Sequence, residues 1–471
     1  MKKVVLAVCV FMFYTYCKGQ NSTPNEVKKK IETYLNTLGE KGFSGSVLVA
    51  YKGKKLVSDG YGLADREKNV KNTKQTVFDI GSITKQFTAA GILKLEMQGE
   101  LAVDDKISKY FKNVPKDKQA ITIHHLLTHS AGLPPAIGDD YEHITKADFL
   151  HKTFKEKLAF NVGSAYEYSN VGYTLLAMII EKVSGETYEN YLYKNLWKPA
   201  KMDQTGYERP NYNPKEIAVG YRTTKTFGKP NEKWDANGPS WHLKGNGGIL
   251  STVEDMYKWH KALVGTKILS TNAKQKYYTK YIEEGEDAGS YYGYGWAIFP
   301  TPRNTELIAH NGGNGVFFAD FWRYLTEDIV IFSANNAISA DYERINMEIA
   351  GIILRKDYEP NTDLGETREG DFDKVELEQL AMTFLSTIQK KDKVAWKEFI
   401  ETQTMDHFAK MISMEKHLEM FAKIHEKVKN KKLTEVRLEG DELILILTDK
   451  ELILNLEVQN EVLKVAGIFI E

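Results

Sequence analysis

Residues 78–91 read FDIGSITKQFTAAG, an apolar run of small side chains with a lysine three places after a serine. Residues three apart share one face at the start of a helix, so the Lys85 amine can reach the Ser82 oxygen. A buried lysine is costly to keep charged, which lowers its pKa and lets it accept a proton. The pattern S-x-x-K therefore predicts a serine nucleophile beside a lysine base, with helix N–H groups facing an oxyanion.

The motif occurs a second time, at Ser413 and Lys416 in the tetrapeptide SMEK. This copy lies in a polar amphipathic helical pattern, where a serine and a lysine on one turn are typical of a solvated face. We therefore expect chemistry at the first copy and none at the second.

Two further triplets support the first copy. Tyr168 and Asn170 stand in EYSNVGY, just ahead of a helical pattern, and His310 and Gly312 stand in AHNGGNG, at the end of a strand pattern. A tyrosine close to a lysine can pass a proton as a general base and acid, and an asparagine amide can bind a substrate carbonyl. Other Y-x-N triplets, predicted to be accidental because they lie inside helical patterns, begin at Tyr34, Tyr188 and Tyr193.

The order S-x-x-K, Y-x-N, H-x-G resembles the serine β-lactamase and penicillin-binding-protein superfamily. It is most similar to the class C β-lactamase-related branch, which also holds D-alanyl-D-alanine carboxypeptidases, D-aminopeptidases and esterases. The likeness covers roughly residues 25–355. The segments that carry it beyond the triplets, in family order, are FSGSVLVAYKGKKLVSDGYGLAD, ITIHHLLTHSAGLP, YSNVGYTLLAMIIEKVSG and GNGGILSTVEDMYKW.

The resemblance implies a role for each matching residue. Ser82 corresponds to the acylated nucleophile, Lys85 to its activating partner, and Tyr168 to the general base that returns a proton to the leaving group. Asn170 corresponds to the amide that positions substrate. The backbone N–H groups of Ser82 and Gly313 would form an oxyanion hole, in which each donor is typically worth about 10²–10³ in rate.

The third triplet departs from the family's β-lactamases, which usually carry K-T-G where this chain has His310, Asn311 and Gly312. All three are expected to bind substrate. Histidine there resembles the carboxypeptidase and aminopeptidase members, and its charge would disappear within the working pH range. The expected substrates are therefore D-amino-acid or cell-wall-type peptides, then small esters, then β-lactams, whose hydrolysis ranks low although they could still acylate the serine. A non-catalytic binding protein on the same fold is the rival from another class.

The strand and helix patterns predict an α/β architecture. A helical pattern over 25–41 and a hairpin turning at Gly53 come first, helical patterns dominate from about 82 to 270, and strand patterns return before a helix over 340–357. The economical arrangement is one antiparallel sheet built from both ends of the region, flanked by terminal helices, with an inserted helical lobe. This is the β-lactamase/transpeptidase-like fold that the resemblance implies.

We expect a hydrolase domain over 20–357, a polar linker over 358–372, and a smaller C-terminal α+β accessory domain over 373–471. The last unit shows two or three helical patterns followed by four short strands in a meander. It loosely resembles cone-shaped folds of the nuclear-transport-factor type. Because a fold does not define an activity, we expect a packing or interaction module.

Residues 1–19 read as a secretory signal peptide, with two lysines, an apolar run and a small residue, Gly19, before the expected cleavage site. The protein is therefore expected to be exported, to the periplasm or beyond. Lipid attachment at Cys17 is the alternative, and the only membrane link expected. A formal net charge of −1 gives no reason to expect a nucleic-acid partner. His125 and His129 have helical metal-ligand spacing but stand where a helix ends, so neither a metal nor an organic cofactor is expected.

Overall fold

The computed structural model describes residues 23–470 apart from short gaps, so the expected signal segment and Cys17 lie outside the described residues. The gaps are 223–224, 236–237, 286–287, 338–343, 363–373, 406–407, 410–412, 440–441, 449 and 460–461. Most of the expected linker over 358–372 falls in one of them. In the described part of the chain, no helix has the length and apolar character needed to cross a membrane.

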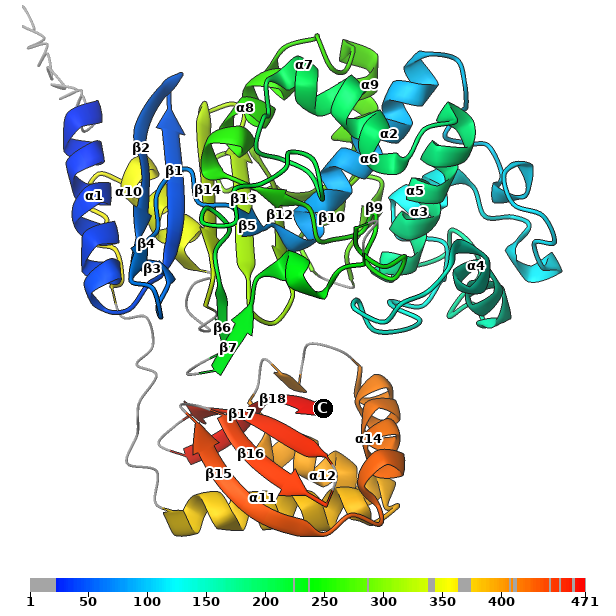
Figure 1. Ribbon diagram of the computed structural model, residues 1–471, viewed down its shortest axis with the longest axis vertical. Helices are drawn as coiled ribbons and strands as arrows, with labels where there is room; N and C mark the ends of the chain where they lie inside the picture. Colours follow the sequence, from blue (N-terminus) through cyan, green and yellow to red (C-terminus); the bar gives the residue numbers. More distant parts are fainter. Residues whose placement is uncertain are drawn as a thin grey trace, which may run out of the picture.

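The central element is an antiparallel sheet of eight described strands in the order β2-β1-β14-β13-β12-β11-β10-β9. Figure 1 shows that strands from both ends of the first region lie side by side in it. The strands are β1 (Gly45–Tyr51), β2 (Lys54–Tyr61), β9 (Ile282–Glu283), β10 (Tyr291–Tyr292), β11 (Ala297–Pro300), β12 (Glu306–Gly313), β13 (Phe318–Tyr324) and β14 (Ile329–Asn335). The expected fold class is confirmed.

Side-chain alternation along the strands explains why both faces of the sheet are covered. On β1, Val47 and Val49 belong to the apolar cluster beneath the terminal helices, whereas Leu48 and Ala50 belong to the cluster beneath the helical lobe. Successive residues of a strand point to opposite faces, so a strand that is apolar throughout needs partners on both sides.

Two helices from opposite ends of the region cover one face. They are α1 (Pro24–Glu40) and α10 (Ile345–Leu354), which pack together at the left of the sheet in Figure 1. Thr23 begins α1 with a capping box, since its hydroxyl accepts from the Glu26 N–H and the Glu26 carboxylate accepts from the Thr23 N–H. α10 packs on β14 and β13.

The helical lobe covers the other face. At its centre lies α2 (Thr84–Met97), which is buried almost all round because it packs against α5 (Asn170–Ser184), α6 (Tyr188–Leu192) and α9 (Thr271–Tyr277). A 3₁₀ turn, η1 (Gly81–Ile83), runs directly into α2. Other helical elements are α3 (Ile123–Leu127), α4 (Lys146–Lys155), the π-helical turn η4 (Tyr193–Trp197), α7 (Lys198–Ala200), α8 (Val253–Val264) and three short 3₁₀ turns, η2 (Ile107–Lys109), η3 (Lys116–Lys118) and η5 (Pro230–Lys233).

The C-terminal unit has its own sheet and its own apolar core. Its sheet is a meander in the order β15-β16-β17-β18, as the turn pattern predicts. Its elements are α11 (Lys374–Gln389), α12 (Lys393–Gln403), α14 (Met414–Val428), β15 (Leu433–Glu439), β16 (Glu442–Leu447), β17 (Glu451–Gln459) and β18 (Val462–Ile470). Phe384, Trp396 and Phe421 sit at the centre of this core.

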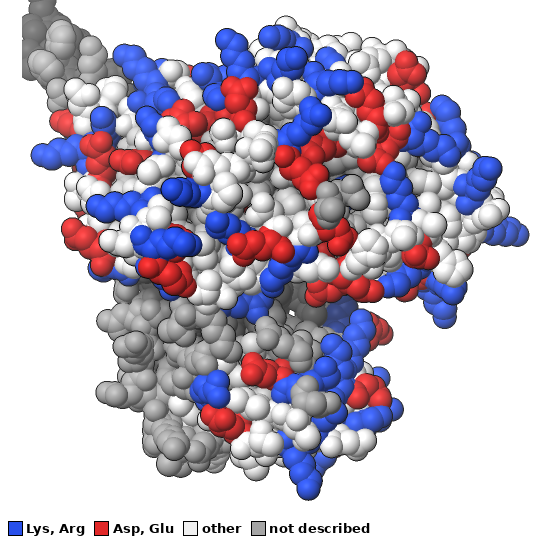
Figure 2. Space-filling model, in the orientation of Figure 1, with Lys and Arg blue, Asp and Glu red and all other residues white. Residues whose placement is uncertain are grey.

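Basic and acidic side chains are interspersed over the face of the molecule shown in Figure 2. This distribution agrees with the formal net charge of −1. One ion pair joins the two units: the Lys416 ammonium on α14 contacts the Glu167 carboxylate of the first unit.

Candidate active site

The first S-x-x-K copy folds as the spacing predicts. Ser82 lies in η1, two residues ahead of the first residue of α2, and Lys85 lies in the first turn of α2. The Lys85 Nζ atom is 2.9 Å from the Ser82 Oγ atom. Two other acceptors fix the same nitrogen: the Asn170 Oδ1 atom and the Asn246 carbonyl oxygen, each at 2.8 Å. The amine is thus aimed at the serine hydroxyl.

The Lys85 side chain is fully buried, and this burial holds its pKa well below the usual 10.5. A neutral amine has two N–H groups and one lone pair. The two N–H groups match the carbonyl-type oxygens of Asn170 and Asn246, which can only accept. The lone pair of that neutral form would face the Ser82 oxygen, to which Nζ donates in this structure. Because burial favours loss of the ammonium proton, the amine is placed and oriented to take up the Ser82 proton.

Tyr168, which immediately precedes the N-cap of α5, is the third catalytic side chain of the candidate site. Its ring centroid lies 4.6 Å from the Lys85 Nζ atom. Burial raises the pKa of the Tyr168 phenol above its usual range, and a hydrogen bond with Ser82 opposes this shift. The phenol is therefore protonated at neutral pH. Of the two candidate bases, Lys85 is the one able to take the first proton, while Tyr168 has a proton to give.

His129, which the sequence suggests only as one half of a metal-ligand pair with His125, holds the segment around Tyr168 in place. The His129 Nδ1 atom accepts from the Ser169 N–H at 3.0 Å, and the His129 carbonyl accepts from the Glu167 N–H at 3.0 Å. The His129 ring lies 4.3 Å from the Tyr168 ring, centroid to centroid. His129 is thus hydrogen-bonded to the backbone on both sides of Tyr168.

The same histidine has an unusual backbone and an unusual ring environment. Its φ is 58°, a left-handed conformation that is uncommon outside glycine and asparagine. Since Nδ1 accepts a hydrogen bond, Nε2 carries the ring proton, and this buried atom has no partner among the described residues. α3 ends at Leu127, so His129 and His125 do not share a helix face. The described residues contain no group of three or more metal-ligating side chains.

The predicted oxyanion donors come together because two glycines let two backbones touch. A Cβ on Gly312 would lie 2.3 Å from the Ser82 nitrogen, and a Cβ on Gly81 would lie 2.6 Å from the Gly313 nitrogen. No side chain fits in either place. The end of β12 therefore lies directly against the turn that carries Ser82, with the backbone nitrogens of Ser82 and Gly313 on adjoining segments.

A buried carboxylate ties these two segments together. The Asp79 carboxylate accepts from the Gly81 N–H at 2.8 Å and from the Asn314 Nδ2 group at 2.9 Å. Asn314 in turn accepts from the N–H groups of Val316 and Phe317. Burial raises the pKa of Asp79 to about 6. Asp79 belongs to the opening stretch of the sequence, yet nothing in its spacing marks this contact in advance.

His310 is neutral, which corrects the expectation of a pH-dependent positive charge in the working range. Its Nδ1 atom lies 2.6 Å from the Asn311 carbonyl, which can only accept, so Nδ1 carries the proton. Its Nε2 atom then accepts from the Tyr292 hydroxyl at 2.9 Å. Burial and the nearby Lys85 lower the pKa of His310 to about 3. Both ring nitrogens are occupied, so the ring acts as a fixed hydrogen-bonding element.

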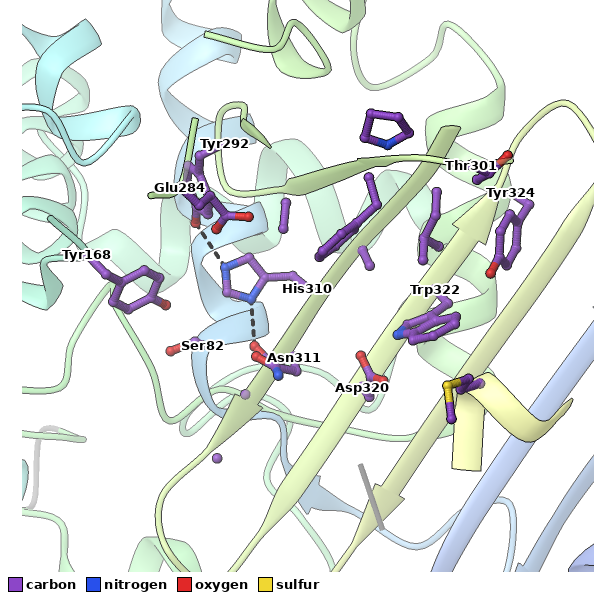
Figure 3. A pocket seen from close by; sticks show the side chains of 18 of the residues that line it. Ser82, Tyr168, Glu284, Tyr292, Thr301, His310, Asn311, Asp320, Trp322 and Tyr324 are labelled. Carbon is purple, nitrogen blue, oxygen red and sulfur yellow. Dashed lines mark hydrogen bonds between the residues drawn. The ribbon is translucent and has the colours of Figure 1, made fainter. Parts of the chain in front are cut away.

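A pocket of about 740 Å³ opens onto Ser82, and Figure 3 shows it from close by. The predicted residues that line it are Ser82, Tyr168, His310, Asn311, Gly312 and Gly313. Lys85 and Asn170 are not among the lining residues; Lys85 is hydrogen-bonded both to Ser82, which lines the pocket, and to Asn170. Sequence reasoning did not single out Tyr292, which has no motif, or Asn246, although Asn246 lies in the quoted segment GNGGILSTVEDMYKW.

Carboxylates outnumber cations around this pocket. Glu284 and Asp320 line it, and burial raises the pKa of Glu284. Arg303 is the one lysine or arginine among the described lining residues, and its guanidinium is paired with Glu327 at 2.7 Å. The undescribed gaps between residues 23 and 362 contain no lysine, arginine or histidine.

The other motif copies stay away from the site. Ser413 begins α14 as its N-cap, and the Lys416 ammonium contacts Glu167 rather than the serine. The Y-x-N triplets predicted to be accidental lie within α1, α6 and η4.

Comparisons with known proteins match the part of the chain that contains this site. The sequence profile of the family described as Beta-lactamase matches residues 27–350. Penicillin-binding protein 4* of Bacillus subtilis is 30% identical over 346 residues, covering 69% of this chain and 76% of that protein. Protein flp of Staphylococcus aureus is 30% identical over 303 residues, and this chain spans only 59% of its length. A penicillin-binding protein structure from Bacillus halodurans has a TM-score of 0.58 at 27% identity, covering 67% of this chain and 98% of that one.

Proposed function

Since the chain belongs to the beta-lactamase family, we propose that it is a serine hydrolase that forms an acyl-enzyme at Ser82 with amide or ester substrates. One observation carries the proposal: a buried Lys85 amine, held by two acceptors, lies 2.9 Å from the Ser82 hydroxyl. A structural lysine has no need of this arrangement. Burying an amine beside a hydroxyl is costly, and nucleophile activation accounts for the cost.

In acylation, the Ser82 oxygen attacks the substrate carbonyl carbon while its proton moves to the Lys85 nitrogen. The carbonyl π electrons move to oxygen, and the N–H groups of Ser82 and Gly313 donate to that developing charge. Asp79 and Asn314 hold the two segments that bear these donors, so little reorganisation is needed during the reaction.

When the tetrahedral intermediate collapses, the bond from carbon to the leaving group breaks. The leaving group takes the Tyr168 hydroxyl proton, and Tyr168 regains a proton from the Lys85 ammonium that acylation produced. In deacylation, water attacks the acyl carbon and loses a proton to the same pair. The Ser82–carbon bond then breaks, and Ser82 recovers its proton. His129 acts as a positioning residue, because it holds the backbone on either side of Tyr168.

The charges around the pocket bear on the substrate class. A substrate carboxylate beside the scissile bond would meet Glu284 and Asp320, with no unpaired cation among the described lining residues. His310 does not supply a charge, since both ring nitrogens are already bonded. Like charges repel more strongly where water is scarce. We therefore place esters and amides without a neighbouring carboxylate first.

D-amino-acid peptides with a free amine form the second candidate class. The Glu284 carboxylate favours it, because this group lines the pocket near Tyr292 and could accept from a substrate ammonium (Figure 3). Peptides that end in a carboxylate, and β-lactams, rank below both classes. A binding protein without catalysis is the rival of another class, and the intact Ser82–Lys85–Tyr168 arrangement argues against it.

The test has two parts. A fluorophosphonate probe should label Ser82, as read by peptide mass spectrometry, and should leave Ser413 unmodified. A panel of p-nitrophenyl esters, D-alanyl peptides and nitrocefin should then show turnover of the neutral esters with the highest kcat/KM. If Ser82 is not labelled and no substrate class is turned over, the result would support the alternative of a non-catalytic binding protein.

We also propose that the protein is exported, on the pattern of residues 1–19 alone. Mass spectrometry of the protein from its native host separates the two processing routes. A mature chain starting at Gln20 indicates signal peptidase cleavage after Gly19, and a lipid-modified Cys17 indicates membrane anchoring.

A further inference from the structure

The pocket at Ser82 extends well beyond the catalytic residues that line one end of it. Beyond Asn311 it continues over the face of the sheet that carries α1 and α10. Cross-strand partners point to the same face, and the partners here are Asn311 with Asp320, Ala309 with Trp322, and Leu307 with Tyr324. Figure 3 shows Asp320, Trp322 and Tyr324 following one another along β13, away from Ser82.

This extension lies beside α10. α10 packs on β14 and β13, and its Met347 side chain forms one wall of the extension. The segment from Phe299 to Arg303 forms the other wall. From Asn311 to Leu307 the floor is four residues long, which corresponds to about 13 Å at strand rise.

The extension is apolar, and part of it is left open. Phe299 is 37% exposed and Met347 is 40% exposed, which places both among the few large apolar side chains at the surface. The wall also includes Pro300 and Pro302, and the floor includes Leu307 and Trp322. At the far end the Arg303 guanidinium is engaged by Glu327. A cluster of exposed apolar side chains continuous with a nucleophile indicates a site for an apolar group.

The position of Tyr168 decides which half of a substrate would lie there. Tyr168 lies on the far side of Ser82 from the extension, as Figure 3 shows. The leaving group must approach the Tyr168 hydroxyl to take its proton. The acyl group is bonded to the same carbon on the opposite side, so it points along the sheet face.

We infer that the groove formed by Phe299, Leu307, Ala309, Trp322 and Met347 is an acyl-chain subsite, and that the preferred substrates carry an extended apolar acyl group. This inference rests on the proposed function, since it names the acyl half of the substrate of the Ser82 centre. Each methylene buried on the groove should raise kcat/KM about fourfold.

The experiment uses p-nitrophenyl acetate, butyrate, hexanoate and octanoate, so that the leaving group stays constant. In the full-length protein kcat/KM should rise along the series. Met347→Ala should lower kcat/KM for the octanoate at least threefold and leave the acetate within about twofold. Ala309→Ile, which fills the floor, should lower the octanoate value more than tenfold with the same small effect on the acetate. Thermal melts of each variant check that it is folded.

Met97→Ala is the matched control, because Met97 is 42% exposed at the end of α2 and does not line the pocket. It should leave the whole series unchanged. A flat or falling series in the wild-type protein, or equal effects of Met347→Ala on acetate and octanoate, would overturn the inference while leaving the hydrolase proposal intact.

A binding arm keeps the inference testable if no ester is turned over. Ser82→Ala protein should bind octanamide more tightly than acetamide by calorimetry, and the added Met347→Ala substitution should remove the difference. Equal affinities would overturn the subsite. Absent turnover with chain-dependent affinity would instead count against the hydrolase proposal alone.

Discussion

The two S-x-x-K copies in this chain have the same spacing and opposite surroundings. At the first copy the Lys85 side chain is fully buried, and its nitrogen is hydrogen-bonded to the Ser82 hydroxyl. At the second copy the Lys416 side chain is 46% exposed, and the Ser413 hydroxyl accepts from the Lys416 backbone N–H as a helix N-cap. Spacing brings both pairs onto one helical turn, but only burial turns the lysine into a base.

The neighbours of each copy reinforce this difference. Lys85 has two fixed acceptors, Asn170 and Asn246, so the lone pair of its neutral form can point only towards Ser82. Lys416 instead forms an ion pair with Glu167 at the surface. A motif thus indicates where chemistry could occur, and the surrounding side chains decide whether it does.

The largest expected effect separates the two serines. Ser82→Ala should lower kcat for a p-nitrophenyl ester by about 10⁴–10⁶, because it deletes the nucleophile. Ser413→Ala should leave kcat unchanged and cost about 1 kcal/mol of stability in the C-terminal unit, because it removes an N-cap. Steady-state kinetics and thermal melts on both variants measure this. Equal rate losses would show that the comparison is wrong.

A second pair of substitutions compares the lysines. Lys85→Met should lower kcat/KM by about 10²–10⁴, since it removes the general base. Lys416→Met should leave kcat/KM within about twofold, because an exposed ion pair contributes only about 0–1 kcal/mol. Rates with the same ester measure both. If Lys85→Met retained wild-type activity, another group would have to be the base.

A third prediction concerns His129, which belongs to the surroundings of the first copy only. His129→Leu should lower kcat by about 10- to 100-fold, because the acceptor that holds the Tyr168 segment is lost. His129→Asn should keep most of the activity, since asparagine tolerates a positive φ and its Oδ1 atom can replace Nδ1. The loss should be greater for an ethyl ester than for a p-nitrophenyl ester, because only the poorer leaving group depends on the Tyr168 proton. Equal losses for the two esters would reduce His129 to a packing role.

Burial of Lys85 should also be visible in the pH dependence of stability. Burial holds the pKa of Lys85 in the folded chain well below 10.5, whereas the unfolded chain binds a proton up to the usual pKa of 10.5. Unfolding therefore takes up a proton between the depressed folded pKa and 10.5, so this group's contribution to stability rises with pH in that window. The slope is about 1.4 kcal/mol per pH unit.

Denaturant unfolding of wild-type and Lys85→Met protein between pH 7 and pH 9 measures this slope. The free energy of unfolding of the wild type, relative to the variant, should increase with pH. Lys416→Met serves as the exposed control and should run parallel to the wild type. Parallel lines for all three proteins would mean that Lys85 is charged in the folded state.

The smallest effect concerns His310. With its pKa lowered to about 3, the ring stays neutral from pH 6 to pH 8. The ratio of kcat/KM for a carboxylate-bearing ester to that for a neutral ester should therefore change by less than about twofold across this range. His310→Lys should raise the ratio by at most about fivefold, because burial at this position disfavours the ammonium form. A wild-type ratio that falls steeply with pH would show that the His310 imidazolium forms and binds the substrate carboxylate.

Much of the fold was predictable because local patterns decide it. The hairpin at Gly53, the strand-rich ends around a helical lobe, and the C-terminal meander all follow from residue periodicity and turn residues. S-x-x-K, Y-x-N and H-x-G mark three segments that the fold brings together at one pocket. These features depend on neighbours in the chain, and a sequence records its neighbours directly.

What the tertiary structure decided depends on residues that are distant in the chain. The lowered pKa values of Lys85 and His310 result from burial by several elements, and no motif specifies them. His129 contacts the Tyr168 segment from 39 residues away only because the loop after α3 packs against the start of α5. The apolar groove lies between Met347 of α10 and the segment from Phe299 to Arg303, which are distant in the chain. Spacing along the chain indicates which side chains can share a site, whereas their protonation, their orientation and the space beside them depend on packing between elements.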